Sequence, residues 1–122
     1  MGEFRTAGSA TRKGDLVEIT AGQDIYEVPV SVMTGIVSRG DKDLILVRNL
    51  QTSLDGTIWT PAGSICMSRT GRSVSIRPWK GGHYVINAEE MRDVLRGNIS
   101  SATVFEVVYT AETSSKGQPV RA

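Results

Sequence analysis

The residues best suited to chemistry lie in one stretch, SRTGRSVSIRPWKGGHYVINAEEMRDVLRG, which runs from position 68 to position 97. This stretch combines arginine and lysine side chains with an indole, a double glycine and the one histidine of the chain. Cations and flat rings together favour binding of single-stranded nucleic acid, because the cations neutralise phosphates and the bases stack on the rings. The candidate binding residues are Arg69, Arg72, Arg77, Trp79 and Lys80.

The distribution of charge supports a positive surface in this region. The formal net charge is only +1, but residues 14–55 hold seven acids against three bases, whereas residues 56–88 hold four bases and no acid. A segment with this composition can form a surface that binds an anion. The alternative is that the four bases are scattered over an ordinary solvated face.

Signatures of catalysis are few. His83 follows two glycines at the start of a predicted strand, where a lone histidine is more often a surface or turn residue than a catalyst. Cys66 is the only cysteine, so an internal disulfide is excluded, and it is interpreted as a structural thiol. No metal-ligand spacing, phosphate-binding glycine loop or nucleophile elbow occurs. We therefore predict no enzyme activity, no cofactor and no metal site.

A hairpin is predicted to position the candidate binding residues, over positions 64–79. A two-residue turn at Thr70 and Gly71 would pair the residues of its buried face, Met67 with Val74 and Ile65 with Ile76. Threonine is a poor residue for positive φ, so a three-residue loop with a left-handed Gly71 is the alternative. With either turn, alternation along the second strand places Arg77 and Trp79 together on the face opposite the buried one. Trp79 could instead cap the edge of the core.

One helix is predicted over residues 88–96. Asn87 is a good N-cap, and Glu90 follows three residues later, where it can complete a capping box. Gly97 can provide the left-handed residue that ends the helix. The apolar stripe would consist of Ala88, Met91, Val94 and Leu95.

The rest of the interior has the pattern of short strands separated by turns. These strands are predicted at 16–20, 25–38, 43–50, 58–60, 83–86 and 102–110. Pro29 has no N–H to donate, which places the second of them at an edge or a bulge. No internal repeat is evident. The fold class is therefore α+β and mainly β, with a curved or barrel-like antiparallel sheet of about six or seven strands against one α-helix.

The chain is expected to form one domain. Residues 1–13 have no periodicity and are predicted to be a flexible arm, residues 14–110 form the β-rich domain, and residues 111–122 form a flexible tail. No apolar run is long enough to cross a membrane. The N-terminus lacks the apolar core of a signal peptide, which favours a cytoplasmic location.

Residues 74–95, VSIRPWKGGHYVINAEEMRDVL, resemble the core of transcriptional coactivators of the positive-cofactor-four type and their bacterial relatives. The matching residues are Ile76, Arg77, Trp79, Lys80, Gly81, Gly82, Ile86, Glu89, Glu90 and Leu95. The resemblance implies a curved antiparallel sheet followed by a helix, a homodimer, and binding of single-stranded DNA along the sheets. It also implies that Arg77, Trp79 and Lys80 lie on or near the binding surface.

Together these features predict a non-enzymatic nucleic-acid-binding module that favours single strands and forms a homodimer. The alternative is a protein-interaction or small-ligand-binding β domain. Such a module would expose the apolar strand 43–50 or the edge of the strand 102–110.

Overall fold

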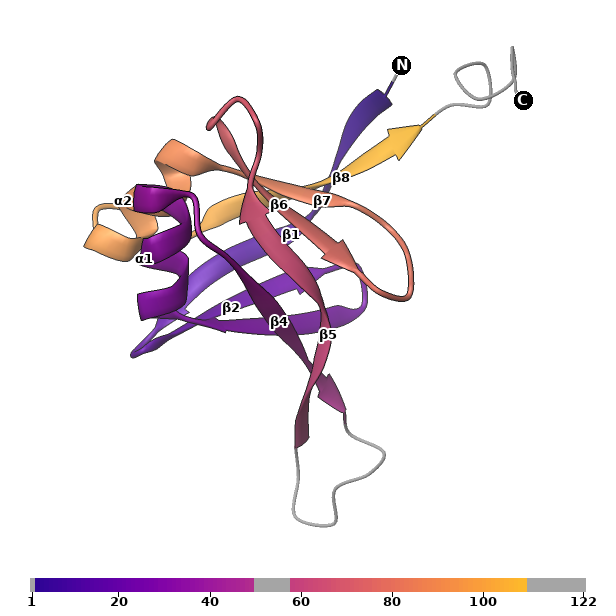
Figure 1. Ribbon diagram of the computed structural model, residues 1–122, viewed down its shortest axis with the longest axis horizontal. Coiled ribbons are helices and arrows are strands. Elements are labelled where there is room, and N and C mark those ends of the chain that lie inside the picture. The colour runs from indigo at the N-terminus through magenta and orange to yellow at the C-terminus, as the bar shows by residue number, and fades with distance from the viewer. Residues whose placement is uncertain (1, 50–57, 110–122) are drawn as a thin grey trace.

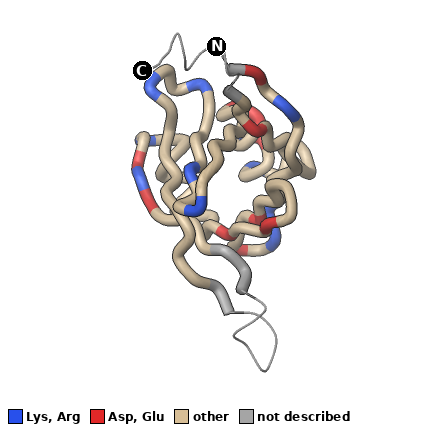
Figure 2. Tube along the Cα trace, turned by 90° about the vertical axis from the view of Figure 1, so that its right-hand side faces the viewer, with Lys and Arg blue, Asp and Glu red and all other residues tan. Residues whose placement is uncertain are grey.

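In the computed structural model, which describes residues 2–49 and 58–109, eight antiparallel strands form a closed barrel (Figure 1). The strands are β1 (Gly2–Lys13), β2 (Leu16–Ala21), β3 (Asp24–Pro29), β4 (Lys42–Asn49), β5 (Ile58–Met67), β6 (Ser73–Pro78), β7 (Tyr84–Asn87) and β8 (Ala102–Tyr109). Each strand pairs with the next, and β8 pairs with β1 to close the ring, which Figure 2 shows from the end away from the helices. The predicted class, α+β and mainly β with a barrel-like sheet, is confirmed, with eight strands and two helices in place of about seven and one.

Two helices cover one end of the barrel (Figure 1). Helix α1 (Val30–Arg39) follows β3, and α2 (Ala88–Arg96) follows β7. Since β3 and β7 run in the same direction in an up-and-down barrel, both helices leave the barrel at the same end, where they contact each other. Buried residues on these helices join the core, Met33 and Ile36 from α1 and Met91 and Val94 from α2. No helix within the described ranges is long and apolar enough to cross a membrane.

Alternate residues of the strands fill the barrel interior. The largest fully buried side chains contributed by strands are Val17, Ile19, Tyr26, Val28, Ile45, Ile65, Val74, Ile76 and Ile86. Because side chains of a strand point alternately to its two faces, the residues between these core positions face outward. The outer face is therefore where a binding site on the sheet must lie.

The barrel consists of two halves with the same order of elements, a structural repeat that was not evident in the sequence. Residues 2–49 (the first half) and residues 58–109 (the second half) both follow the order strand, strand, strand, helix, strand. Their cross-strand register is also the same. Val17 pairs with Val28 and Ile19 with Tyr26 in the first half, and Val74 pairs with Ile86 and Ile76 with Tyr84 in the second.

Backbone hydrogen bonds repeat between the halves as well. Gly22 N donates to Ala7 O at 3.0 Å in the first half, and Trp79 N donates to Ala62 O at 2.8 Å in the second. The N–H of the first helical residue repeats in the same way, since Val30 N donates to Asp15 O at 2.7 Å and Ala88 N to Arg72 O at 2.9 Å. The repeat is thus a property of the backbone, although the side chains have diverged.

A glycine marks the same bulge in each half. Gly8 and Gly63 both lie within an Ala-Gly-Ser triplet, next to a shift of register against β8 and β4 respectively. A Cβ atom on Gly8 would overlap the backbone carbonyl of Thr20, and one on Gly63 would overlap that of Arg77. These close approaches between strands require glycine at both positions.

The prediction of one strand over residues 25–38 is wrong, because β3 ends at Pro29 and α1 begins at Val30. Valines and isoleucine in this run suggested a strand. Their spacing also fits a helix, and the buried residues Met33, Ile36 and Val37 form one helical face. Pro29 suits the start of a helix, and Gly40, with φ of 73°, ends it in the left-handed conformation.

The prediction of a flexible arm over residues 1–13 is also wrong, because β1 pairs with both β2 and β8. Its inward positions are occupied by small residues such as Ala10, so the strand lacks the apolar alternation that usually marks one. The single β-rich domain therefore includes this segment. The predicted tail, residues 111–122, lies outside the described residues.

The hairpin pairs as the two-residue turn predicts, with Ile65 opposite Ile76 and Met67 opposite Val74. Its loop is longer, because Ser68 N donates to Ser73 O at 2.8 Å and closes the hairpin there. Gly71 has φ of 73°, so the left-handed glycine of the alternative is also present.

Helix α2 has the predicted bounds and caps. The Asn87 side chain accepts a hydrogen bond from Glu90 N at 3.0 Å, and Gly97 is left-handed with φ of 80°. The Glu90 carboxylate does not return to the N-cap as a capping box would require. Instead, Glu90 Oε1 accepts a hydrogen bond from Thr103 N at 3.3 Å, which ties the helix to β8.

Candidate nucleic-acid interface

A row of paired residues crosses the outer face of the second half. Cys66 on β5 pairs with Ser75 on β6, Ser75 with Val85 on β7, and Val85 with Phe105 on β8. Thr6 on β1 continues the row beyond Phe105. Because strand neighbours of these residues, such as Ile65, Ile76 and Val104, are buried in the core, the row itself faces outward.

A second row lies beside the first, toward the end of the barrel away from the helices. Arg77 on β6 pairs with Ser64 on β5. The row continues in the other direction from Arg77, toward β8. There Val107 N donates to His83 O at 2.8 Å, and Val107 pairs with Phe4 on β1. The two rows bring a guanidinium, an imidazole and two phenyl rings onto one continuous sheet surface.

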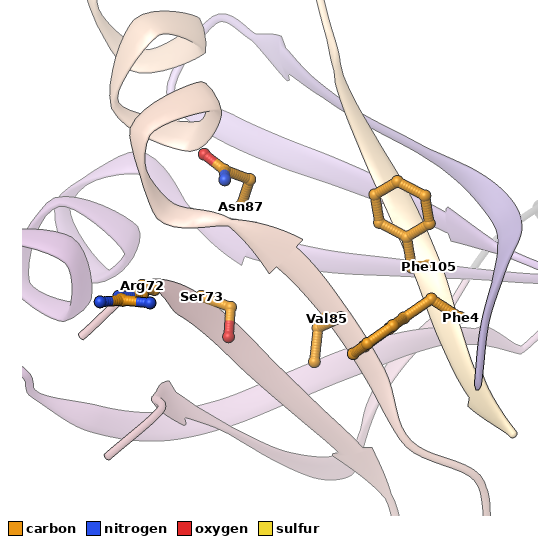
Figure 3. Close-up of a pocket in the computed structure, with 6 residues that line it drawn as sticks. All are labelled: Phe4, Arg72, Ser73, Val85, Asn87 and Phe105. Atoms are coloured by element: carbon orange, nitrogen blue, oxygen red, sulfur yellow. The ribbon is translucent and has the colours of Figure 1, made fainter. Parts of the chain in front are cut away.

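The phenyl rings form one side of a pocket on this surface, which we call the phenylalanine pocket (Figure 3). It has a volume of about 320 Å³ and is lined by Phe4, Arg72, Ser73, Val85, Asn87 and Phe105. The Phe4 and Phe105 rings meet edge to face, with centroids 6.5 Å apart and planes at 80°. Phe4 is 67% exposed and extends from β1 toward Val85, so its ring face is open to a ligand (Figure 3).

A second pocket adjoins the first and shares Ser73 and Val85 with it. We call it the arginine pocket. Its volume is about 400 Å³, and it is lined by Cys66, Met67, Ser68, Arg69, Thr70, Ser73, Ser75, Arg77, His83 and Val85. The two pockets together form a groove across the outer face. No Asp or Glu of the described residues lines either pocket.

A partly buried polar pair lies in the arginine pocket. Ser75 is 7% exposed, and its Oγ lies 2.7 Å from His83 Nε2. Burial lowers the pKa of His83 below its usual 6.5, and the positive charge of Arg77 lowers this pKa further. The imidazole is therefore neutral near pH 7. Its Nδ1 atom is buried and has no hydrogen-bond partner in the part of the chain that the structure describes.

The structure brings together three of the five residues predicted to bind. Arg69 and Arg77 line the arginine pocket, and Arg72 lines the phenylalanine pocket. Among residues 2–49 and 58–109, no carboxylate forms an ion pair with any of these arginines. Within these ranges, their charges are not compensated by a carboxylate.

Trp79 and Lys80 lie outside both pockets, in the connection between β6 and β7. The Trp79 side chain is 64% exposed, so it does not cap the core. Lys80 forms an ion pair with Asp24, the first residue of β3. Trp79 can extend the groove as an open ring, whereas the Lys80 charge is already partly compensated.

Sequence reasoning missed the two phenylalanines and underrated His83. Phe4 lies in the segment interpreted as an arm, and only the repeated Ala-Gly-Ser triplets at 7–9 and 62–64 could have indicated that this segment is a strand. Phe105 faces outward because Val104 is the core residue of β8. His83 faces Ser75 across the β6–β7 pair, a proximity that the register reveals only once both strands are placed.

The first half shows what the same backbone looks like without a basic groove. At the positions equivalent to Cys66, Ser75, Val85 and Phe105, it has a row of Thr11, Glu18, Glu27 and Leu46, paired in the same order. Glu18 forms an ion pair with Lys13 at 2.9 Å. Two acids, Glu18 and Glu27, therefore lie on the outer face of the first half, at the positions where the second half has Ser75 and Val85.

Residues that could hold a metal are not gathered in this region, since no group of three His, Cys, Asp or Glu side chains occurs in the described ranges. Comparisons of the chain with protein-family models, with curated proteins and with solved structures found no significant match.

Proposed function

We propose that the groove binds single-stranded nucleic acid. The observation on which this proposal depends is the position of two phenyl rings beside three arginines, in adjoining pockets that no carboxylate of residues 2–49 and 58–109 lines. Bases stack on aromatic rings, and guanidinium groups neutralise the phosphates between them. The arrangement offers both kinds of contact along one path.

Single strands fit this surface better than a duplex. The Phe4 and Phe105 rings are suited to stacking on the flat face of a base, and that face is covered in a double helix. The groove also lies on a curved sheet and not on a protruding helix that could enter a major groove. The resemblance of residues 74–95 to coactivators that bind single-stranded DNA along their sheets supports the same class of ligand.

The interaction-module alternative is less well supported by the geometry. It depends on an exposed apolar strand or a free sheet edge, and β8 is paired on both sides, with β7 and with β1. Leu44 is the exposed large apolar residue of β4 among those whose side chains are described. The homodimer implied by the resemblance would likewise have to form through another surface, because the closed barrel offers no unpaired strand.

Fluorescence anisotropy with labelled single-stranded and duplex oligonucleotides of the same sequence tests the proposal. The single strand should bind more tightly, and its affinity should fall steeply with salt as counterions are released. Phe105→Ala should weaken binding about tenfold or more, since one stacked base contributes roughly 1–3 kcal/mol. Leu46→Ala, at the equivalent position of the first half, is the matched control and should leave affinity unchanged. Equal effects of the two substitutions, or binding indifferent to salt, would contradict the proposal.

A further inference from the structure

The arginine pocket has the chemistry of an anion site and not of a base-stacking site. Its charged residues are Arg69 from the β5–β6 loop and Arg77 from β6, and hydroxyl groups of serines lie between them. The aromatic rings belong to the neighbouring phenylalanine pocket. The two parts of the groove therefore differ in the part of a nucleotide that each can recognise.

The Ser75–His83 hydrogen bond leaves the Ser75 hydroxyl able to act as a hydrogen-bond donor in this pocket. A neutral imidazole has one N–H, and a buried N–H without a partner is more costly than a buried lone pair. Since Nδ1 is buried with no partner among the described residues, we assign the proton to Nε2, which donates to Ser75 Oγ at 2.7 Å. The hydroxyl hydrogen of Ser75 is then free to donate to a ligand in the pocket.

The equivalent place in the first half lacks the counterparts of Arg77 and of the Ser75–His83 pair. Thr20 is found where the second half has Arg77, and Thr20 pairs with Ile25, which takes the place of His83. Glu18 is found where the second half has Ser75. The same backbone thus supports an acidic surface in one half and a cationic, hydroxyl-lined pocket in the other, so the pocket is a property of these side chains and not of the barrel.

We propose that the arginine pocket is a phosphate-binding site, in which Ser75 donates a hydrogen bond to a phosphate oxygen and Arg69 and Arg77 balance its charge. This inference deepens the proposed function, because it assigns the phosphate of a bound strand to the arginine pocket and the adjoining base to the phenylalanine pocket. Arginine is suited to this role, since its planar fork can donate two hydrogen bonds to one phosphate.

The single histidine gives a direct readout at the site. Imidazole NMR resonances of the full chain should shift and saturate on titration with inorganic phosphate. Ser75 is hydrogen-bonded to His83, and the positive charge of Arg77 acts on the imidazole. Cys66 and Arg69 line the same pocket, and the uncharged Val107 contacts His83 through its backbone N–H. A bound phosphate adds negative charge beside these cations, so the pKa of His83 should rise when phosphate is present.

Substitutions distinguish binding of phosphate in the arginine pocket from a general effect of positive charge on the protein. Arg77→Ala should weaken phosphate binding about tenfold or more, because a hydrogen bond to a charged group is lost. Ser75→Ala should weaken it by a smaller factor. Arg96→Ala removes an exposed arginine of α2, outside the groove, and should have no effect. His83 resonances that ignore phosphate, or equal affinities for phosphate in the Arg77 and Arg96 variants, would overturn the assignment.

Oligonucleotides identify the source of the phosphate and keep this inference distinct from the proposed function. A strand with a terminal phosphate that binds more tightly than its hydroxyl counterpart, with the gain lost in Arg77→Ala, shows that the pocket takes a terminal monoester. Equal affinities, with both reduced in Arg77→Ala, show that it takes an internal phosphodiester. Oligonucleotide binding without any response of His83 defeats the phosphate pocket alone. A phosphate response without oligonucleotide binding defeats the proposed function alone.

Discussion

Val85 and Glu27 hold the same position in the two halves of the barrel. Val85 pairs with Ser75, and Glu27 pairs with Glu18, in the same register and on the same outer side of the sheet. The chain itself therefore shows that this backbone position accommodates a carboxylate. The outer faces of the two halves therefore differ here in side-chain charge and not in backbone structure. A single substitution can test the effect of that charge.

Val85→Glu should strongly weaken binding of single-stranded nucleic acid while the barrel remains folded. Val85 lines both pockets, so a carboxylate there would repel phosphates along the whole groove. We expect a loss of affinity of at least tenfold by fluorescence anisotropy, with a melting temperature close to that of the unchanged protein. Val85→Gln, similar in size but neutral, should retain most of the affinity. If the Glu variant binds as tightly as the Gln variant, the groove is not the binding surface.

The two glycine bulges should be equally intolerant of a side chain. Gly8→Ala and Gly63→Ala each place a Cβ against a backbone carbonyl that cannot move without breaking strand pairing. We expect each to lower the free energy of unfolding by about 1–3 kcal/mol, as overpacking does in protein cores. Chemical denaturation followed by circular dichroism measures this change.

Gly14→Ala is the control for the bulges. Gly14 has φ of 63° but no atom within 4 Å of a built Cβ, so only conformational strain of about 1–2 kcal/mol applies. If only one of the two bulge substitutions is destabilising, the halves are not equivalent in packing, despite their shared register.

Local signals allowed part of this fold to be predicted from sequence. The hairpin pairing of Ile65 with Ile76 followed from alternation and a glycine in the turn, and the bounds of α2 followed from Asn87 and Gly97. Helix α1 was missed because β-branched residues satisfy both periods over a short run. The pairing of β1 with β8 joins the two ends of the described chain, and no local pattern records such a contact.

The site was predictable only in part, because some of its contacts join residues that are far apart in the sequence. Arg69, Arg72 and Arg77 were identified because they lie close together in sequence on one hairpin. Phe4 and Phe105 meet only through closure of the barrel, so their rings could not be associated with the arginines in advance. The Ser75–His83 bond depends on the register of β6 against β7.

Asn87→Ala should destabilise the protein by about 1 kcal/mol, because Asn87 Oδ1 accepts the Glu90 N–H that otherwise has no partner within the first turn of α2. Differential scanning calorimetry should show a lower melting temperature. Asn98→Ala, just beyond the end of the same helix, should have a smaller effect, since its side-chain contact to Asp93 is long and exposed, at 3.4 Å. Equal changes for the two variants would show that the cap does not contribute as assigned.

Acidification should destabilise the fold through His83. Its pKa in the folded state is lowered from 6.5 by burial and by Arg77, so below pH 6.5 the unfolded chain binds a proton that the folded chain resists. The free energy of unfolding should therefore fall as the pH decreases from about 6.5 toward the folded-state pKa of His83. Below that pKa, the contribution of His83 should level off.

Urea denaturation at a series of pH values, compared with His83→Gln, measures the effect, and the variant should lack the dependence in this range. NMR titration of the single imidazole gives the folded pKa independently. A folded pKa at or above 6.5, or the same pH dependence in His83→Gln, would show that the imidazole is not held neutral by its surroundings.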